Sequence, residues 1–266
     1  MKALKKTSLI LIVALVFGGG AWSCKRKPVE IAPEVAASDE ALYKAGQVIM
    51  KKDAEKARLY FRQVIDSFPK SFYAQRAKLA IADSYFDKGD ESNMILASSE
   101  YREFIQLYPY SPSASYAQYR IAMSFFKKAL KAGRDQTKTT QALIELKKVI
   151  TNFPLSEEAK LAQKQIGECE ERLAEHNFNI GEHYYRVQAF KAATDRLSEI
   201  VTAYPSYSRM DKVYFYLADS YYRWRKIEES TPYFTKLVTD FPESKFTKKA
   251  QARLAEINKA SAKPAR

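Results

Sequence analysis

The sequence predicts an all-α fold, a curved stack of about five helix pairs, and two observations carry this prediction. A proline follows an aromatic residue five times, at spacings of 40, 45, 51 and 37 residues, and a period of this length is typical of stacked-repeat architectures. On both sides of each proline, apolar residues recur with the periodicity of one helix face. The aromatic-proline pairs are Phe68-Pro69, Tyr108-Pro109, Phe153-Pro154, Tyr204-Pro205 and Phe241-Pro242.

A helix is predicted before each proline. Four residues before it stands isoleucine or valine, and the positions eight and twelve residues before it hold a large apolar and a small residue. Proline then ends the helix, because it has no N–H group and disfavours helical geometry in the preceding residue. The small residues are Ala57, Ala97, Ala142, Ala193 and Ser230, and the large ones are Phe61, Tyr101, Leu146, Leu197 and Phe234.

A second helix is predicted after each proline. A serine two residues beyond four of the five prolines is suited to cap exposed amide groups; these are Ser71, Ser111, Ser156 and Ser244. Small residues at eight and thirteen positions past the proline let two helices approach closely. A large apolar residue at position twelve fills the space between them. Each pair therefore needs its neighbour in order to bury its apolar face.

This order of small residue, large residue and proline resembles the tetratricopeptide repeat, although the units exceed its usual length of about 34 residues. The extra length lies in a loop around Gly133 and in the proline-free stretch from Glu168 to Phe190. The helix that begins near Ser156 is therefore predicted to continue to about Arg186, as a long helix in the fourth unit. A single solenoid domain of five repeats is expected over residues 40–258.

The N-terminus has the pattern of an export signal, predicted over residues 1–23. Lysines precede an apolar run at residues 9–17, which is too short for an ordinary membrane span. Cys24 follows it and resembles the lipid-accepting cysteine of a bacterial lipobox, although Ala21 and Trp22 depart from the usual residues. The alternative is cleavage by ordinary signal peptidase, which would release a soluble protein. Residues 24–39 are predicted to form a lipidated, flexible tether, and residues 259–266 a basic disordered tail.

The chain is basic, with 44 lysines and arginines against 31 aspartates and glutamates. Nucleic acid is not an expected partner, because the chain is predicted to be exported and has no recognisable nucleic-acid-binding motif. Attraction to anionic lipid headgroups and a plainly solvated surface both remain open.

No catalytic, cofactor or metal site is predicted, and the chain is not expected to be an enzyme. Cys169, His176 and His183 share a helix face at steps of seven residues. That step corresponds to a rise of about 10.5 Å, whereas one metal ion needs its ligands within about 2.3 Å. We therefore expect structural or surface roles for them. Glycine-rich phosphate loops, serine elbows and zincin motifs are also absent from the sequence.

One segment indicates which family of repeat proteins the chain resembles. It contains Gly-Arg-Asp-Gln-Thr at residues 133–137, Arg-Leu-Ala-Glu-His at residues 172–176 and Gly-Glu-His-Tyr-Tyr at residues 181–185. In this order and spacing, with five repeats and Cys24, the chain resembles the BamD family, repeat-built lipoproteins of the outer-membrane β-barrel assembly machine. The sequence departs from the family in its unusual lipobox and its basic C-terminal helix.

This resemblance implies a lipid-anchored adaptor on the periplasmic face of the outer membrane. Its N-terminal repeats would receive unfolded outer-membrane protein precursors, and its C-terminal repeats would bind the POTRA domains of the barrel subunit. Other assembly lipoproteins are further expected partners. Arg196 matches an arginine of the family's docking helix and is expected to meet a POTRA carboxylate. The alternative function is that of a soluble or peptidoglycan-associated periplasmic repeat protein in cell division or envelope maintenance.

Overall fold

The computed structural model describes residues 31–261, and within them every regular element is a helix. The predicted signal peptide, residues 24–30 of the predicted tether, including Cys24, and the last five residues of the tail lie outside the described residues. The helices are α1 (Pro33–Ala36), α2 (Asp39–Met50), α3 (Ala54–Ser67), α4 (Phe72–Phe86), α5 (Glu91–Leu107), α6 (Ala114–Phe126), α7 (Thr137–Asn152), α8 (Glu157–Arg186), α9 (Phe190–Ala203), α10 (Met210–Arg223), α11 (Ile227–Asp240) and α12 (Thr247–Ser261).

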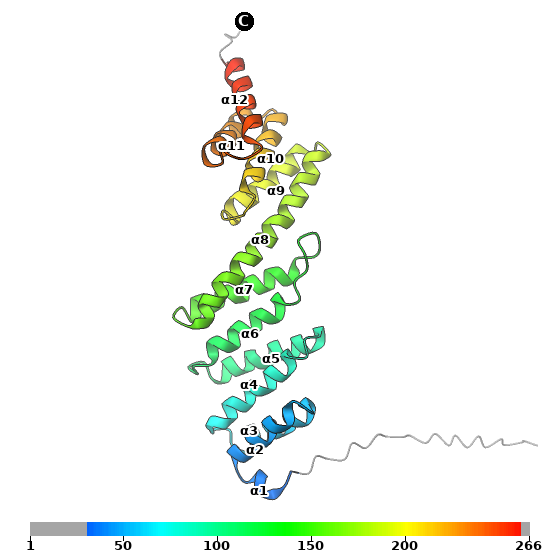
Figure 1. The fold of residues 1–266 in the computed structure, drawn as a ribbon, viewed down its shortest axis with the longest axis vertical. Helices are drawn as coiled ribbons and strands as arrows, with labels where there is room; N and C mark the ends of the chain where they lie inside the picture. The colour runs from blue at the N-terminus through cyan, green and yellow to red at the C-terminus, as the bar shows by residue number, and fades with distance from the viewer. Residues whose placement is uncertain (1–30, 262–266) are drawn as a thin grey trace, which may run out of the picture.

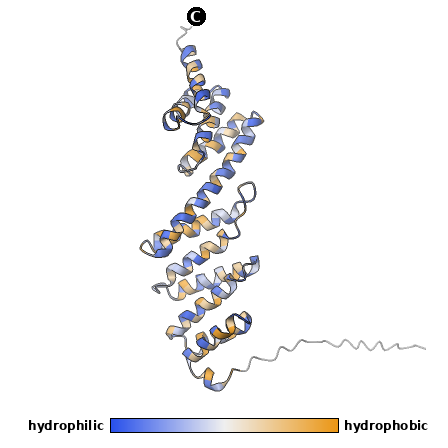
Figure 2. Cartoon of the chain, viewed as in Figure 1, coloured by the Kyte–Doolittle hydropathy of each residue, from blue (hydrophilic) through white to orange (hydrophobic). Residues whose placement is uncertain are grey.

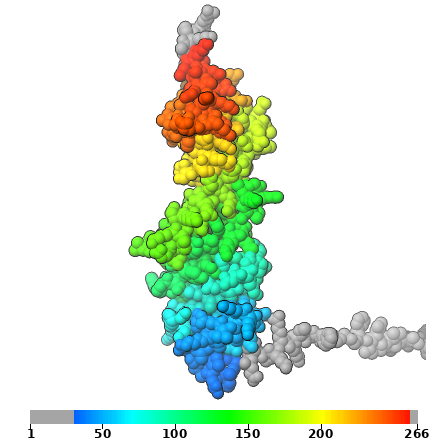
Figure 3. Space-filling model, viewed as in Figure 1, coloured from blue at the N-terminus to red at the C-terminus, as the bar shows by residue number. Residues whose placement is uncertain are grey.

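The helices form a stack in which each layer contacts the next along the chain (Figure 1). The five pairs are α2/α3, α4/α5, α6/α7, α8/α9 and α10/α11, and α12 packs on α11 at the C-terminal end. In the space-filling view the colours follow one another in chain order along a rod (Figure 3). This arrangement confirms the predicted all-α repeat solenoid of about five pairs.

The aromatic-proline pairs mark the turns between pairs. Helices α3, α5, α7, α9 and α11 each end at the aromatic residue, whose N–H donates to the carbonyl four residues earlier. The next helix begins within a few residues. Ser71 and Ser156 cap α4 and α8 by accepting hydrogen bonds from the backbone N–H groups of Tyr73 and Ala159. The proline thus stops one helix, and the serine starts the next.

The predicted columns form the core. All five small residues and all five large residues of the helices before the prolines are fully buried. Figure 2 shows hydrophobic and hydrophilic residues alternating along the helices, as expected for helices that bury one face. Burial of each large side chain contributes about 1.5–3 kcal/mol, so the repeat columns supply much of the stabilisation.

Helix α8 joins two parts of the core. It runs over 30 residues, from Glu157 to Arg186, which confirms the long helix predicted in the fourth unit. Its part up to Leu173 contributes Cys169 and Leu173 to one apolar cluster with α7. Its second half contributes Ala174 and Phe178 to another cluster with α9 and α10. The two halves of the stack therefore share one continuous element.

Two predicted boundaries differ from the observed elements. Helix α1 lies inside the range predicted to be a flexible tether, where Pro33 at the first position favours a helical turn. Helix α12 continues to Ser261, past the predicted start of the tail at residue 259. Alanine and lysine are good helix formers, and this explains the extension.

Candidate functional site

The even-numbered helices line one face of the stack, which we call the even-helix face. Helix α2 contacts α4, and α8 contacts both α6 and α10. Polar side chains also bridge these helices. The hydroxyl of Tyr116 on α6 donates to Asp83 on α4 over 2.7 Å, and the hydroxyl of Tyr185 on α8 donates to Asp219 on α10 over 2.6 Å. Neighbouring repeats are thus joined by hydrogen bonds as well as by the core.

The same polar pairing occurs near both ends of this face. Asp83 and Asp219 each lie fourteen residues after their proline, and Arg120 and Arg253 each lie eleven residues after the proline of a later unit. Arg120 pairs with Asp83 at 3.5 Å, and Arg253 pairs with Asp219 at 3.2 Å. The sequence reasoning missed these residues. An acidic residue directly after a buried small residue was the signal that could have identified them.

A pocket of about 290 Å³, which we call the N-terminal pocket, opens beside Asp83. Its apolar lining comes from Tyr43, Met50 and Phe61, on α2 and α3. The rings of Tyr43 and Phe61 lie 5.5 Å apart. Asp83 of α4 and Asp87, directly after the end of α4, also line the pocket. It therefore combines an aromatic floor with acidic groups.

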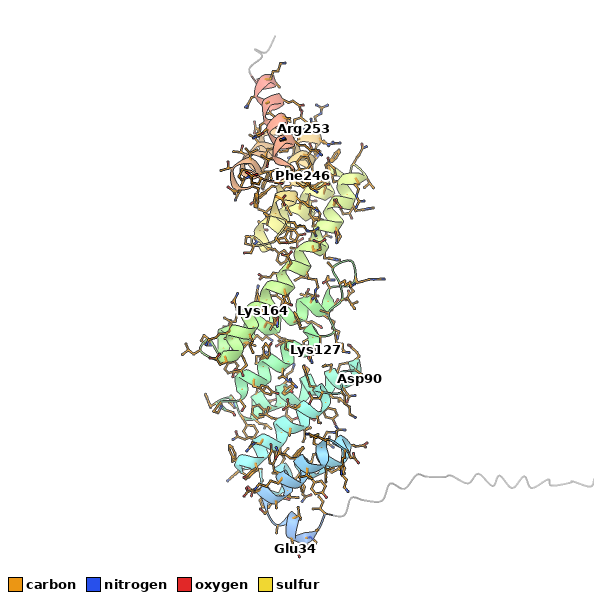
Figure 4. The ribbon with its side chains drawn as sticks, in the orientation of Figure 1. Glu34, Asp90, Lys127, Lys164, Phe246 and Arg253 are labelled. Carbon is orange, nitrogen blue, oxygen red and sulfur yellow. The ribbon has the colours of Figure 1, made fainter. Side chains whose placement is uncertain are left out.

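A second concavity of about 460 Å³, the C-terminal cleft, lies among α8, α10 and α12. Phe215 and Phe246 stack there at 4.8 Å, and Figure 4 labels Phe246 and Arg253 at this end of the stack. The side chain of Asp219 is only 2% exposed and accepts hydrogen bonds from the Nε atoms of Arg223 and Arg253, over 2.6 and 3.2 Å. Arg253 also donates from Nη1 to Glu256 over 2.8 Å, so its guanidinium joins two carboxylates.

The carboxylate of Asp219 also shapes the titration of its neighbour. Burial, together with the hydrogen bond to Asp219, raises the pKa of the Tyr185 phenol well above its ordinary value. Tyr185 therefore remains a neutral hydrogen-bond donor at physiological pH.

Arg196 lies on α9 and is not part of the C-terminal cleft. Its side chain is 49% exposed, and its nearest ionic partner is Glu199, one turn along the helix at 3.8 Å. Asp195 pairs instead with Lys191 at 3.0 Å. A surface pair of this kind contributes less than about 1 kcal/mol to stability. Breaking it so that Arg196 can contact a partner therefore costs little free energy.

Cys169, His176 and His183 do not converge on a shared site. Cys169 is fully buried, and burial raises the pKa of its thiol to about 11. His176 Nδ1 lies 2.7 Å from the carbonyl oxygen of Ala132, in the loop before α7. Within residues 31–261, no group of three or more His, Cys, Asp or Glu side chains is arranged to hold a metal ion. His176 therefore anchors a loop, and Cys169 packs as a small apolar residue.

Cys24 lies outside the described residues, so the structure places no lipid-accepting residue. None of the helices described for this chain combines the length and apolar character needed to cross a bilayer.

Comparison with known proteins shows which family the sequence matches. A family model described as "YfiO: Outer membrane lipoprotein" matches residues 35–231. The outer membrane protein assembly factor BamD of Caulobacter vibrioides is 30% identical over 158 residues, which cover 59% of this chain and 51% of that protein. BamD of Rickettsia prowazekii is 27% identical over 222 residues, with coverages of 80% and 82%. The chain thus spans about half the length of the first relative and most of the second.

Among solved structures, the crystal structure of the MamA protein matches 78% of this chain and 92% of its own. The sequence identity is 15% and the TM-score is 0.32.

Proposed function

Because this chain belongs to the YfiO family of outer membrane lipoproteins, which includes BamD, we propose that it is a non-enzymatic adaptor in the assembly of outer-membrane β-barrel proteins. The observation that carries the proposal is the family match over residues 35–231, which spans almost the whole described stack. A repeat solenoid supports such a role, because its extended surface presents separate sites for several partners.

We propose that unfolded outer-membrane protein precursors bind at the N-terminal pocket. An extended segment can place an aromatic side chain against Tyr43, which lines the pocket beside the fully buried Phe61, and aromatic contacts add about 0.5–1.5 kcal/mol beyond the burial of area. The pocket's 290 Å³ suits one side chain better than a complete small-molecule ligand. This matches a role in holding a chain by a few residues while the remainder stays unfolded.

The C-terminal repeats, in this proposal, dock on the POTRA domains of the barrel subunit, and Arg196 meets a POTRA carboxylate. Arg196 is half exposed and only weakly paired with Glu199. A planar guanidinium can grip a carboxylate through two parallel hydrogen bonds, which a lysine cannot reproduce. Helix α9 also lies in the fourth pair, away from the N-terminal pocket, so both partners can bind at once.

Replacing Arg196 with glutamate is expected to weaken binding to the POTRA domains at least tenfold, because it places two acidic groups opposite each other. Arg196→Lys should recover only part of the affinity, since lysine keeps the charge but loses the bidentate contact. Titration calorimetry with the purified POTRA region would measure both. The matched control is Arg62→Glu, an exposed arginine on α3. Equal affinities for wild type and Arg196→Glu would reject the assignment.

We further propose that the protein resides at the periplasmic face of the outer membrane, anchored by a lipid on Cys24 and accompanied by other assembly lipoproteins. The family description as outer membrane lipoproteins supports this location.

A further inference from the structure

A third concavity, which we call the α5–α7 groove, lies between α5 and α7, where the C-terminal end of α6 forms part of its lining. Its lining includes Met94 and Ile95 of α5 and Phe125 of α6, and its exposed surface is mostly apolar. Figure 4 labels Asp90 and Lys127, which directly precede two other lining residues, Glu91 and Lys128. The groove belongs to neither of the two concavities described above.

The size of the groove restricts what it can hold. Its volume is about 260 Å³, whereas small-molecule sites usually span about 300–1,000 Å³. Ile95 is 60% exposed at its edge, which is a large exposed fraction for an isoleucine. The groove therefore suits one large apolar side chain that projects from a longer segment, as in the central pockets of protein interfaces.

Charges at the groove are unbalanced. The lining carries three cations, Arg102, Lys128 and Lys138, against the single carboxylate of Glu91. Ion pairs join α5 to α7 at two levels. Lys138 pairs with Glu91 at 2.8 Å, and Arg102 pairs with Glu145 at 2.7 Å. The side chain of Glu145 is only 8% exposed, so it does not offer its charge to solvent. The lining therefore carries two more cations than carboxylates, with Arg102 and Lys138 held in ion pairs.

The loop between Lys128 and Lys138 is held in place by side chains. Gln136 is buried, and its amide nitrogen donates to the carbonyls of Lys131 and Arg134, both over 2.9 Å. From α8, His176 holds the carbonyl of Ala132. A binding edge fixed in this way loses little conformational entropy when a partner docks, and this favours affinity.

We propose that the α5–α7 groove binds an acidic, extended polypeptide segment of a protein partner. One large apolar side chain of that segment enters between Ile95 and Phe125, and its flanking carboxylates pair with Lys128 and Arg102. Charge complementarity selects an acidic segment over a basic one. This inference goes beyond the adaptor function proposed above, because it adds a binding site that neither precursors nor POTRA domains require.

Selection from a displayed library of random 12-residue peptides on the purified chain would test the proposal. We expect the selected peptides to share one large apolar residue flanked by aspartate or glutamate. Their affinity should fall at least tenfold on Ile95→Glu, which blocks the groove with a like charge, and on Lys128→Glu. The matched controls are Ile144→Glu, at an isoleucine 52% exposed on α7 outside the groove, and Lys164→Glu, at an exposed lysine on α8.

Circular dichroism should show that all four variants keep the helical content of the wild type, since each site lies at the surface. Selection of no peptide that is sensitive to Ile95→Glu would overturn the proposal. So would peptides rich in lysine and arginine, or equal losses in the control variants. Unchanged POTRA binding by Ile95→Glu would show that the adaptor function stands apart from this site.

Discussion

Replacing Glu168 with proline is expected to lower the free energy of unfolding by about 3 kcal/mol or more. Glu168 is exposed in the interior of α8, so the change removes little packing. Proline removes one hydrogen bond of the helix, and its ring clashes with the carbonyl four residues earlier, at Lys164 (labelled in Figure 4). The break would fall near the junction of the two apolar clusters that α8 connects.

Denaturant unfolding followed by circular dichroism would measure this loss, with Glu168→Ala as the control at the same position. Alanine keeps the helix, so that variant should stay within about 0.5 kcal/mol of the wild type. Hydrogen exchange should also show that α7 and α9 become less protected in the proline variant. A proline variant as stable as the alanine variant would show that the stack does not depend on the continuity of α8.

Truncating Leu197 to alanine is expected to cost about 2–5 kcal/mol, because the side chain is fully buried between α9 and α8. Its partner across the interface is Gly181, where an added Cβ atom would meet Leu197 at 2.8 Å. Gly181→Ala should therefore also destabilise the protein, since overpacking by about 1–3 kcal/mol exceeds the gain in helix propensity of about 0.5–1 kcal/mol. The added atom would also lie 3.6 Å from Arg196.

The double variant provides the decisive comparison. In Leu197→Ala the space for a Cβ atom at position 181 is free. The double variant should therefore lose less free energy of unfolding than the sum of the losses in the two single variants. Gly167→Ala is the matched control, because nothing lies within 4 Å of a Cβ atom placed there. That variant should gain about 0.5–1 kcal/mol from helix propensity alone. Strictly additive losses at positions 181 and 197 would contradict the close contact of α8 with α9.

The repeat framework was predictable because its cause is local and periodic. Each helix carries its own apolar column, and each of the five aromatic-proline pairs ends a helix, so their positions along the chain locate the helix boundaries. The length of α8 followed from the lack of proline between Pro154 and Pro205. Gly181, inside that helix, is a close-packing position, which the sequence pattern did not show.

The sites were less predictable because they join residues from different repeats. The pair of Asp219 and Arg253 forms only when α10 and α12 are stacked, and the α5–α7 groove depends on a loop fixed by Gln136 and His176. The Asp–Arg pairs keep fixed distances from their prolines, but these distances alone do not show that the two residues meet across repeats. Arg196 was identified through family resemblance, and its partner contact stays a prediction.

We propose above that the chain serves the assembly of β-barrel proteins in the outer membrane. The most direct test is to deplete the protein from its own cells and quantify β-barrel proteins in the outer-membrane fraction by mass spectrometry. We expect their amounts to fall together and to recover when the wild-type chain is restored. Unchanged amounts after complete depletion would contradict it.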